Sequence, residues 1–229
     1  MTCAESGKPL PMNRSGEIDF NEERQRMVRE QLSEFPSVVR AAMEIVPRHE
    51  FVPPEDSFRA YADTALPIGH GQTISQPYIV ALMTTRLEPK PTDRILEIGT
   101  GSGYQSAVLA RLAAEIFTLE IVGPLARRAN ARLQRLGCRN VLVRLGDGSG
   151  GWPEAAPFDA VIVTCAPERI PPALTVQLKD AGRLIIPLGG LGDQRLLVYS
   201  KFKGGLVQQA EYPVRFVPMT GAARPARTK

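Results

Sequence analysis

Three alternating glycines, Gly99, Gly101 and Gly103, follow directly on an apolar run that ends in Glu97-Ile98. Glycine lets the backbone turn sharply and lets a ligand approach the chain closely. The residues behind the glycines, 105–112, have the pattern of a helix, and the first turn of a helix offers unpaired N–H groups. The sequence therefore predicts a strand, a glycine turn and a helix that could cradle a nucleotide-like ligand, although a glycine triplet alone also suits a plain tight turn.

Two acidic residues stand where the next two strands are expected to end. Glu120 closes an apolar run over 116–120, and Asp147 follows a run over 140–145. Ligands of open α/β sheets bind at the carboxyl ends of the strands. Glu120 could accept both hydroxyls of a ribose, and Asp147 could accept from the amino group of an adenine. Either acid alone could be a solvated strand end, but together they favour an adenosine-type ligand.

The glycine spacing discriminates among adenosine ligands. It is Gly-x-Gly-x-Gly, not the Gly-x-Gly-x-x-Gly of dinucleotide sites, and the lysine of a phosphate-binding loop is missing. Glu97 would repel a pyrophosphate but tolerates a cationic amino-acid group. These features favour S-adenosylmethionine over NAD, and the run 94–104 resembles the cofactor motif of the Rossmann-like methyltransferases.

The elements that must position these residues alternate along the chain. Alternation of strand and helix predicts a doubly wound, mostly parallel α/β sheet. Two strand-like runs around Gly204-Gly205 predict an antiparallel hairpin at its end, and helices at 22–35 and 38–46 precede it. Segment 60–77 is too rich in Gly, Pro and hydroxyl residues to predict regular structure, and such loops usually carry function. The strands are expected at 94–98, 116–120, 140–145, 158–164, 183–188, 196–202 and 206–217, and the later helices at 78–87, 105–112, 124–136 and 172–178.

The length of 229 residues, with 43% hydrophobic and 23% charged residues, predicts a single soluble domain. We expect that domain over 18–221, with a helical and loop segment on the substrate side, 18–88, and a cofactor-binding sheet, 89–221. A disordered tail, 1–17, and a basic tail, 222–229, flank it.

Charge and cysteine usage limit the function classes. The net charge is +4, and its one dense cluster, from Arg127 to Arg139, is expected on the solvent face of a helix, so we predict no nucleic-acid partner. No apolar run approaches the roughly 20 residues of a membrane span. Cys3, Cys138 and Cys165 have neither a paired nor a metal-like spacing. We therefore expect a cytoplasmic monomer without a metal or a membrane contact.

Several segments closely resemble protein-L-isoaspartate O-methyltransferase of the bacterial type. They are PIGHGQTISQPYIVALM at 67–83, VPRHEFVP at 46–53, AYAD at 60–63 and VRFVPMTG at 214–221, within a resemblance that covers about 27–220. That family methylates the misplaced carboxylate of L-isoaspartyl residues in damaged proteins, and the ester collapses to a succinimide that partly reopens as aspartate. The resemblance implies the same activity here, with S-adenosylmethionine as cofactor and isoaspartyl proteins and peptides as substrates.

The resemblance also implies roles for individual residues. Ser75 matches the residue treated as catalytic, and a carboxylate that is ionised at neutral pH needs alignment more than a base. Ser75 could instead cap the helix that begins at Pro77. Thr220 matches a threonine of the C-terminal segment that closes over the site. The expected cofactor-binding set is Gln72, Thr73, Ile74, Ser75, Glu97, Gly99, Gly101, Gly103, Glu120, Asp147, Gly148 and Thr220.

Two departures from the family pattern, Ser149 and Cys165, concern the cofactor edge. Two alternatives remain open at this point: a methyltransferase of a small molecule or nucleic acid, and a binding module without turnover. Thr164-Cys165-Ala166-Pro167 stands where DNA and RNA amino-methylating enzymes often carry an Asn/Asp-Pro-Pro-aromatic motif, which argues against a nucleic-acid substrate. We expect His49 to pack behind the helices, and His70 either to shape the loop or simply to fill its turn.

Overall fold

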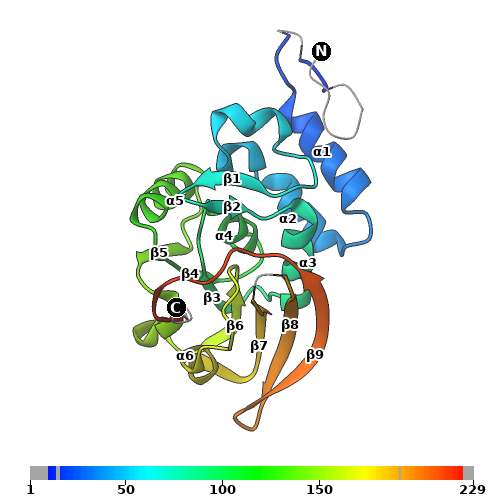
Figure 1. The fold of residues 1–229 in the computed structure, drawn as a ribbon. Helices are drawn as coiled ribbons and strands as arrows, with labels where there is room; N and C mark the ends of the chain where they lie inside the picture. Colours follow the sequence, from blue (N-terminus) through cyan, green and yellow to red (C-terminus); the bar gives the residue numbers. More distant parts are fainter. Residues whose placement is uncertain (1–9, 14–15, 191, 224–229) are drawn as a thin grey trace.

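The computed structural model describes residues 10–13, 16–190 and 192–223. Its centre is a seven-stranded sheet in the order β5-β4-β3-β6-β7-β8-β9 (Figure 1). The pairs from β5 to β7 are parallel, whereas β8 pairs antiparallel with both neighbours. This confirms the predicted fold class, including the closing hairpin, whose turn is Lys203-Gly204. The strands are β3 (Arg94–Ile98), β4 (Glu115–Glu120), β5 (Val141–Leu145), β6 (Phe158–Val163), β7 (Leu178–Leu188), β8 (Gln194–Phe202) and β9 (Gly205–Val214).

The outermost strands of this sheet are β5 and β9. Arg144 lies in β5, and Glu211 and Pro213 lie in β9. Charged residues and proline are common on edge strands, since proline cannot donate to a further strand.

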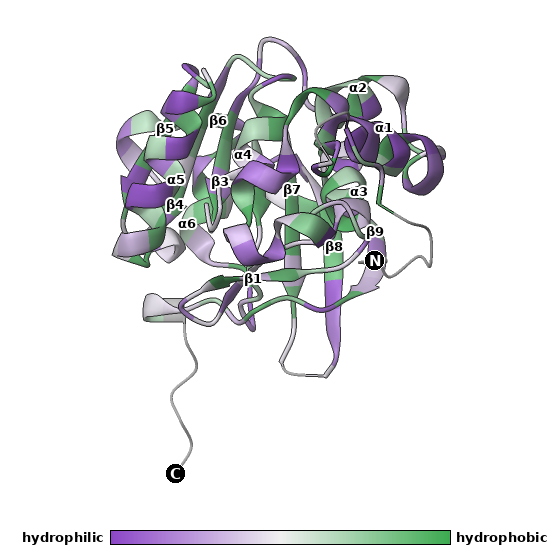
Figure 2. Ribbon diagram, turned by 90° about the horizontal axis from the view of Figure 1, so that it is seen from above, coloured by the Kyte–Doolittle hydropathy of each residue, from purple (hydrophilic) through white to green (hydrophobic). Residues whose placement is uncertain are grey.

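Apolar side chains alternate between the two faces of the sheet. Along β3, Ile95 belongs to one buried cluster and Leu96 and Ile98 to the other. Because both faces are covered, the strands appear in the sequence as nearly continuous apolar runs. Figure 2 shows these hydrophobic strands inside more hydrophilic outer helices such as α1 and α5. The later helices are α3 (Pro77–Leu87), α4 (Tyr104–Leu109), α5 (Gly123–Arg135) and α6 (Pro172–Gln177).

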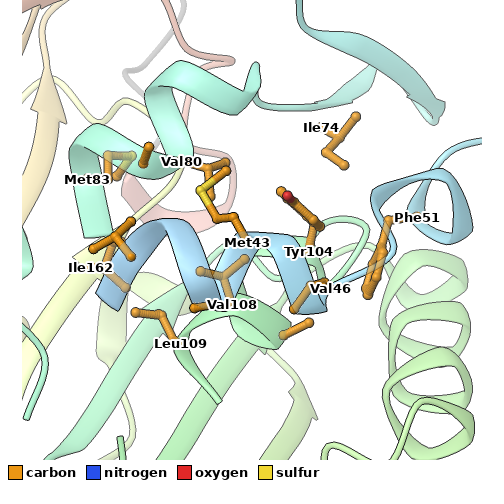
Figure 3. Close-up of a cluster of buried hydrophobic side chains, with 14 of the residues drawn as sticks. Met43, Val46, Phe51, Ile74, Val80, Met83, Tyr104, Val108, Leu109 and Ile162 are labelled. Carbon is orange, nitrogen blue, oxygen red and sulfur yellow. The ribbon is translucent and has the colours of Figure 1, made fainter. Parts of the chain in front are cut away.

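The N-terminal segment joins the larger cluster. It contains α1 (Phe20–Gln31), capped by the Asp19 side chain, and α2 (Ser37–Ile45). Two short 3-10 helices follow, Arg48–Phe51 and Pro54–Arg59. Both α-helices were predicted, although α1 ends four residues before the expected 35. Figure 3 shows side chains of α2, α3 and α4, including Met43, Val80 and Val108, meeting near Ile162 of β6.

The expectation of an irregular segment over 60–77 is wrong in part. A short antiparallel hairpin forms there from β1 (Leu66–Gly69) and β2 (Gln72–Ile74). Its glycines do not interrupt the strands, because Gly69, His70 and Gly71 all have positive φ (87°, 56° and 70°) and make the turn. His70 is therefore part of the turn itself, which suits turn filling as well as a role in shaping the loop. Figure 1 shows the hairpin above the central sheet, on the side of α4.

The ends of the chain are described in part. Of the predicted tail 1–17, residues 1–9 and 14–15 lie outside the described residues, as do residues 224–229 of the basic tail. Leu10 is buried, and Met12 pairs with Ile18 in an isolated bridge. Within the described part of the chain, no helix is long and apolar enough to cross a membrane.

Candidate active site

The glycine turn links the end of β3 to the start of α4, as the sequence predicts. Gly99, Gly101 and Gly103 have φ values of +97°, +55° and +91°, in the region that side chains rarely adopt. The Thr164 hydroxyl donates to the Gly99 carbonyl at 2.6 Å. A Cβ on Gly99 would lie 2.5 Å from the Thr164 Oγ1 atom, so both backbone conformation and space require glycine there.

Glu120 closes the turn from the neighbouring strand. Its carboxylate accepts from the Gly101 N–H at 2.7 Å and from the Val122 N–H at 2.9 Å. The residue is only 6% exposed, so its carboxylate is held at the strand end by backbone donors. Gly103 has a different role, because a Cβ there would lie 3.3 Å from a Leu133 methyl group of α5. It allows α4 and α5 to pack closely.

Glu97 lies fully buried beneath the turn. The Ser106 hydroxyl donates to its Oε2 atom, while Oε1 has no partner among the described residues. Burial raises the pKa of Glu97 to about 7, although the Ser106 hydrogen bond works in the opposite direction. The side chain is therefore poised between its neutral and ionised forms at neutral pH, and a nearby cation would favour the ionised form.

Asp147 ties the C-terminal segment to the sheet. Its carboxylate accepts from the backbone N–H groups of Ser149 at 2.9 Å and Ala222 at 2.7 Å. Burial raises the pKa of Asp147, but these backbone hydrogen bonds outweigh it and the net shift is downward. At the adjacent Gly148, any Cβ would collide with the Ile98 side chain, so only glycine fits over β3.

Two small, neighbouring pockets open at the carboxyl ends of β3, β4 and β6. We call the first, of about 60 Å³, the strand-end pocket, and the second, of about 40 Å³, the serine pocket. Both are bordered by Thr73, Gly99, Gly101 and Thr164, so they share one wall. The strand-end pocket adds the predicted residues Gln72, Glu120, Gly148 and Thr220, and the serine pocket adds Ile74 and Ser75.

Ser75 lies in the link between β2 and α3. The N-cap residue of α3 is Gln76, which makes no side-chain capping bond. The first free N–H group of the helix, that of Tyr78, instead donates to Asp63 at 2.8 Å. The alternative that Ser75 caps the helix is therefore not what the structure shows, and its partly buried hydroxyl borders the serine pocket.

The structure gathers nine of the predicted residues at these pockets and leaves Glu97, Gly103 and Asp147 outside their linings. It also adds residues that the sequence analysis missed. Thr164 stands at the carboxyl end of β6, so the strand-end rule that found Glu120 could have found it too. Other additions, with weaker sequence signals, include Gln105, Ile121, Val122, Val217 and Met219. Cys165, which the sequence marked as a departure at the cofactor edge, lines the strand-end pocket.

The arginine cluster of α5 only partly follows the prediction of a solvent face. Arg132 is half-buried, and its guanidinium donates to the Ser102 carbonyl at 2.8 Å. Arg128 donates to the Ile68 carbonyl of β1 at 3.1 Å. A groove of about 530 Å³ lies between these arginines and residues 51–56, and it shares Gly101 and Ser102 with the lining of the serine pocket.

The remaining histidine and cysteine predictions concern packing. His49 stacks on Phe20, and its Nδ1 atom lies 2.8 Å from the Tyr61 hydroxyl, as expected for a packed residue. Cys138 is a buried free thiol. Burial, with help from Glu120 and Asp147, raises the pKa of Cys165 to about 12, so its thiol is neutral. Among the described residues, no group of three or more His, Cys, Asp or Glu side chains could hold a metal ion.

Three features together define a Rossmann-like methyltransferase. They are a glycine turn after the central strand, a carboxylate at the end of the next strand, and an antiparallel hairpin at the end of the sheet. The family profile of "Protein-L-isoaspartate(D-aspartate) O-methyltransferase (PCMT)" matches residues 22–224. This chain belongs to that family and is an enzyme of that class, which confirms the resemblance seen in the sequence.

Individual relatives agree with the family match. The Protein-L-isoaspartate O-methyltransferase of Gloeobacter violaceus is 57% identical over 183 residues, which cover 80% of this chain and 89% of the relative. That of Anaeromyxobacter sp. is 56% identical over 191 residues, covering 82% and 90%.

Two solved structures share the fold. A protein-L-isoaspartate O-methyltransferase has a TM-score of 0.79 at 29% identity, and the match covers 86% of this chain and 66% of that one. A Plasmodium falciparum protein of the PCMT type, solved with S-adenosyl-L-homocysteine, has a TM-score of 0.78 at 25% identity, covering 89% and 99%.

Proposed function

We propose that this enzyme transfers a methyl group from S-adenosylmethionine to the free carboxylate of L-isoaspartyl residues in damaged proteins, with Ser75 as its catalytic residue. The observation that carries the proposal is the shared wall of Thr73, Gly99 and Gly101 between the strand-end pocket and the serine pocket. A ligand held by the glycine turn would therefore face the Ser75 hydroxyl. The bound S-adenosyl-L-homocysteine of the Plasmodium relative supports the same cofactor.

The residues present suit this cofactor. When bound, it supplies a methyl group on a positively charged sulfur that a carboxylate oxygen can attack. Glu97 lies fully buried beneath the glycine turn, and the negative charge of its ionised form would favour a cationic amino-acid group bound nearby. Glu120 would hold the ribose hydroxyls and Asp147 the adenine amine, because each carboxylate oxygen keeps a second lone pair beside its backbone donor. Gln72, Ile74, Gly148 and Thr220 would border the cofactor.

Ser75 would act on the methyl acceptor. An isoaspartyl carboxylate is ionised at neutral pH, so no strong base has to activate it. A hydroxyl that donates to one carboxylate oxygen leaves the other free and fixes its direction, which is a proximity effect. The resulting methyl ester would then close to a succinimide, as in the family's repair reaction: the following backbone amide nitrogen attacks the ester carbonyl carbon, loses its proton, and methanol leaves.

A paired-peptide assay tests the proposed reaction. We expect labelled methyl to pass from S-adenosylmethionine to an isoaspartyl peptide and not to its normal aspartyl twin. Equal labelling of both peptides, or of neither, would refute the repair assignment. Ser75→Ala should lower turnover by on the order of 100-fold with cofactor affinity retained. Loss of affinity with turnover intact would make Ser75 a cofactor contact.

A matched pair of variants on β4 tests the ribose contact. Glu120→Ala should weaken binding of S-adenosylhomocysteine by about 10-fold or more, as removal of a charged hydrogen-bond partner predicts. Glu115→Ala, at the other end of the same strand, removes a partly exposed salt bridge to Arg94 and should leave binding unchanged. Equal effects of the two variants would point to a general loss of β4 structure.

We also propose that the enzyme works as a monomer in the cytoplasm. Cys138 and Cys165 are free thiols, which suits a reducing compartment. A single monomer peak in size-exclusion chromatography with light scattering is the expected result, and a stable dimer would contradict it.

A further inference from the structure

The helix that follows Ser75 cannot cap its own N-terminus. Pro77 occupies its first turn and has no N–H group, and the N-cap residue Gln76 makes no side-chain capping bond. The acceptor comes from elsewhere in the chain. Asp63 Oδ1 accepts from the Tyr78 N–H at 2.8 Å, and Asp63 Oδ2 accepts from the Gln76 side-chain amide at 3.4 Å. One carboxylate thus holds the residues on both sides of Pro77.

This contact fixes the backbone directly after Ser75. The preceding residue, Ile74, is anchored independently, because it is only 3% exposed and pairs with Leu66 in the hairpin. Ser75 and Gln76 connect this anchored strand to α3, so the direction of the Ser75 side chain depends on where α3 begins. A displacement of about 1 Å in a reacting group can cost on the order of 100-fold in rate.

The loop that carries Asp63 is itself held from inside the protein. The fully buried Arg48 donates through Nε to the Ala60 carbonyl at 2.7 Å and through Nη2 to the Thr64 carbonyl at 3.5 Å. Its guanidinium also lies 4.8 Å from the centre of the Tyr104 ring, at the first residue of α4. The conformation of residues 60–64 is therefore connected through Arg48 to the helix behind the glycine turn.

We propose that Asp63 is a positioning residue for Ser75, acting as the remote cap of α3. The proposal rests on the catalytic role proposed for Ser75. It gives a function to two segments that resemble the family but to whose residues the resemblance assigned no role. They are VPRHEFVP, which contains Arg48, and AYAD, which contains Asp63. The property that matters is the acceptor oxygen beside the Tyr78 N–H, so an amide of the same shape should replace the carboxylate.

The test compares three variants by turnover, peptide KM, affinity for S-adenosylhomocysteine and thermal unfolding. Asp63→Ala should lower kcat by on the order of 10-fold with cofactor affinity unchanged. Asp63→Asn should restore most of the turnover, because its side-chain oxygen can accept the Tyr78 N–H. Asp19→Ala is the matched control: the Asp19 carboxylate caps α1 and borders neither pocket, so its loss should lower the unfolding temperature without changing kcat.

A double-mutant cycle completes the test. If Asp63 acts through Ser75, Asp63→Ala should cause no further loss of kcat in the Ser75→Ala background. The same 10-fold loss in both backgrounds, or an unchanged kcat in Asp63→Ala alone, would overturn the positioning role. Failure of the proposed catalytic role of Ser75 is a separate outcome, because it would appear as full activity of the Ser75→Ala variant by itself. That result would overturn the positioning role of Asp63 as well, since Asp63 is proposed to act through Ser75.

Discussion

The glycine turn at 99–103 and the hairpin segment at 66–76 border the same pockets, but different contacts hold them there. The turn is fixed by the sheet: the Gly99 N–H donates to the Leu119 carbonyl at 2.8 Å, and Glu120 of the same strand accepts from Gly101. The hairpin segment is fixed by side chains of other elements, chiefly Arg128 of α5 and Asp63 of the preceding loop.

This difference separates two kinds of sensitivity. A residue of the turn is constrained by backbone conformation and by immediate neighbours in the sheet, so a change there should affect the cofactor first. A residue that supports the hairpin segment acts from a distance, so a change there should affect stability or turnover first. Four variants test this separation, from the largest expected effect to the smallest.

Arg48→Ala should have the largest effect, on the hairpin side. It removes a fully buried guanidinium and leaves the carbonyls of Ala60 and Thr64 without their donors. Burial lowers the pKa of Arg48 to about 10, so the side chain is still charged at neutral pH. We expect the free energy of unfolding to fall by about 3 kcal/mol or more in urea titration. The exposed Arg127→Ala is the control, and an equal loss in both variants would contradict this account.

Glu97 should make the stability of the turn region depend on pH. Its pKa of about 7 in the folded protein exceeds the value near 4.5 of the unfolded chain, so folding favours the protonated form. The contribution of Glu97 to the free energy of unfolding is fully present below about pH 4.5, decreases as the pH rises, and is lost above about pH 7. The free energy of unfolding differs by about 3 kcal/mol between these limits. Glu97→Gln should remove this slope in urea titrations between pH 4.5 and 7. If the free energy of unfolding of Glu97→Gln still changes with pH in this range, the pH dependence belongs to another group.

Gly99→Ala should affect the cofactor more than the hairpin segment. The new methyl group would press on the Thr164 hydroxyl, and the positive φ adds about 1–2 kcal/mol of strain. We expect S-adenosylhomocysteine to bind about 10-fold more weakly by calorimetry, which corresponds to about 1.4 kcal/mol. Gly150→Ala is the control, because a Cβ there meets no atom within 4 Å. Unchanged binding by Gly99→Ala would show that the turn is not a ligand cradle.

Arg128→Ala should have the smallest effect. It removes one hydrogen bond, to the Ile68 carbonyl, worth about 1 kcal/mol. Amide hydrogen exchange in residues 72–74 should become faster while that of β3 stays unchanged. Arg128→Lys keeps a cationic donor, so the exchange rate of residues 72–74 in this variant should lie between those of Arg128→Ala and the parent protein. Faster exchange in both regions would mean that the two sides of the site are not independent.

The sequence analysis succeeded where local patterns decide the structure. Apolar runs of the right length marked the strands from β3 onward, and the glycines marked the turn, because backbone conformation there depends on the residues themselves. It missed β1 and β2, since two strands of four and three residues carry too little periodic signal and their glycines suggested a loop.

Long-range side-chain contacts set the limit of sequence prediction at the site. Nothing in the helical pattern of α5 shows that Arg132 reaches the Ser102 carbonyl, 30 residues away in the chain. Likewise, Asp63 caps a helix that begins 14 positions later, which no local capping rule detects. Family resemblance pointed to Ser75, but only the structure shows how the backbone on either side of it is held.

The two outer strands of the sheet bear on how this enzyme meets its substrates. A bare sheet edge can bind other extended chains indiscriminately by adding them as extra strands. Pro213 and Glu211 in β9 and Arg144 in β5 oppose that pairing. A further strand is therefore disfavoured at either edge of the sheet.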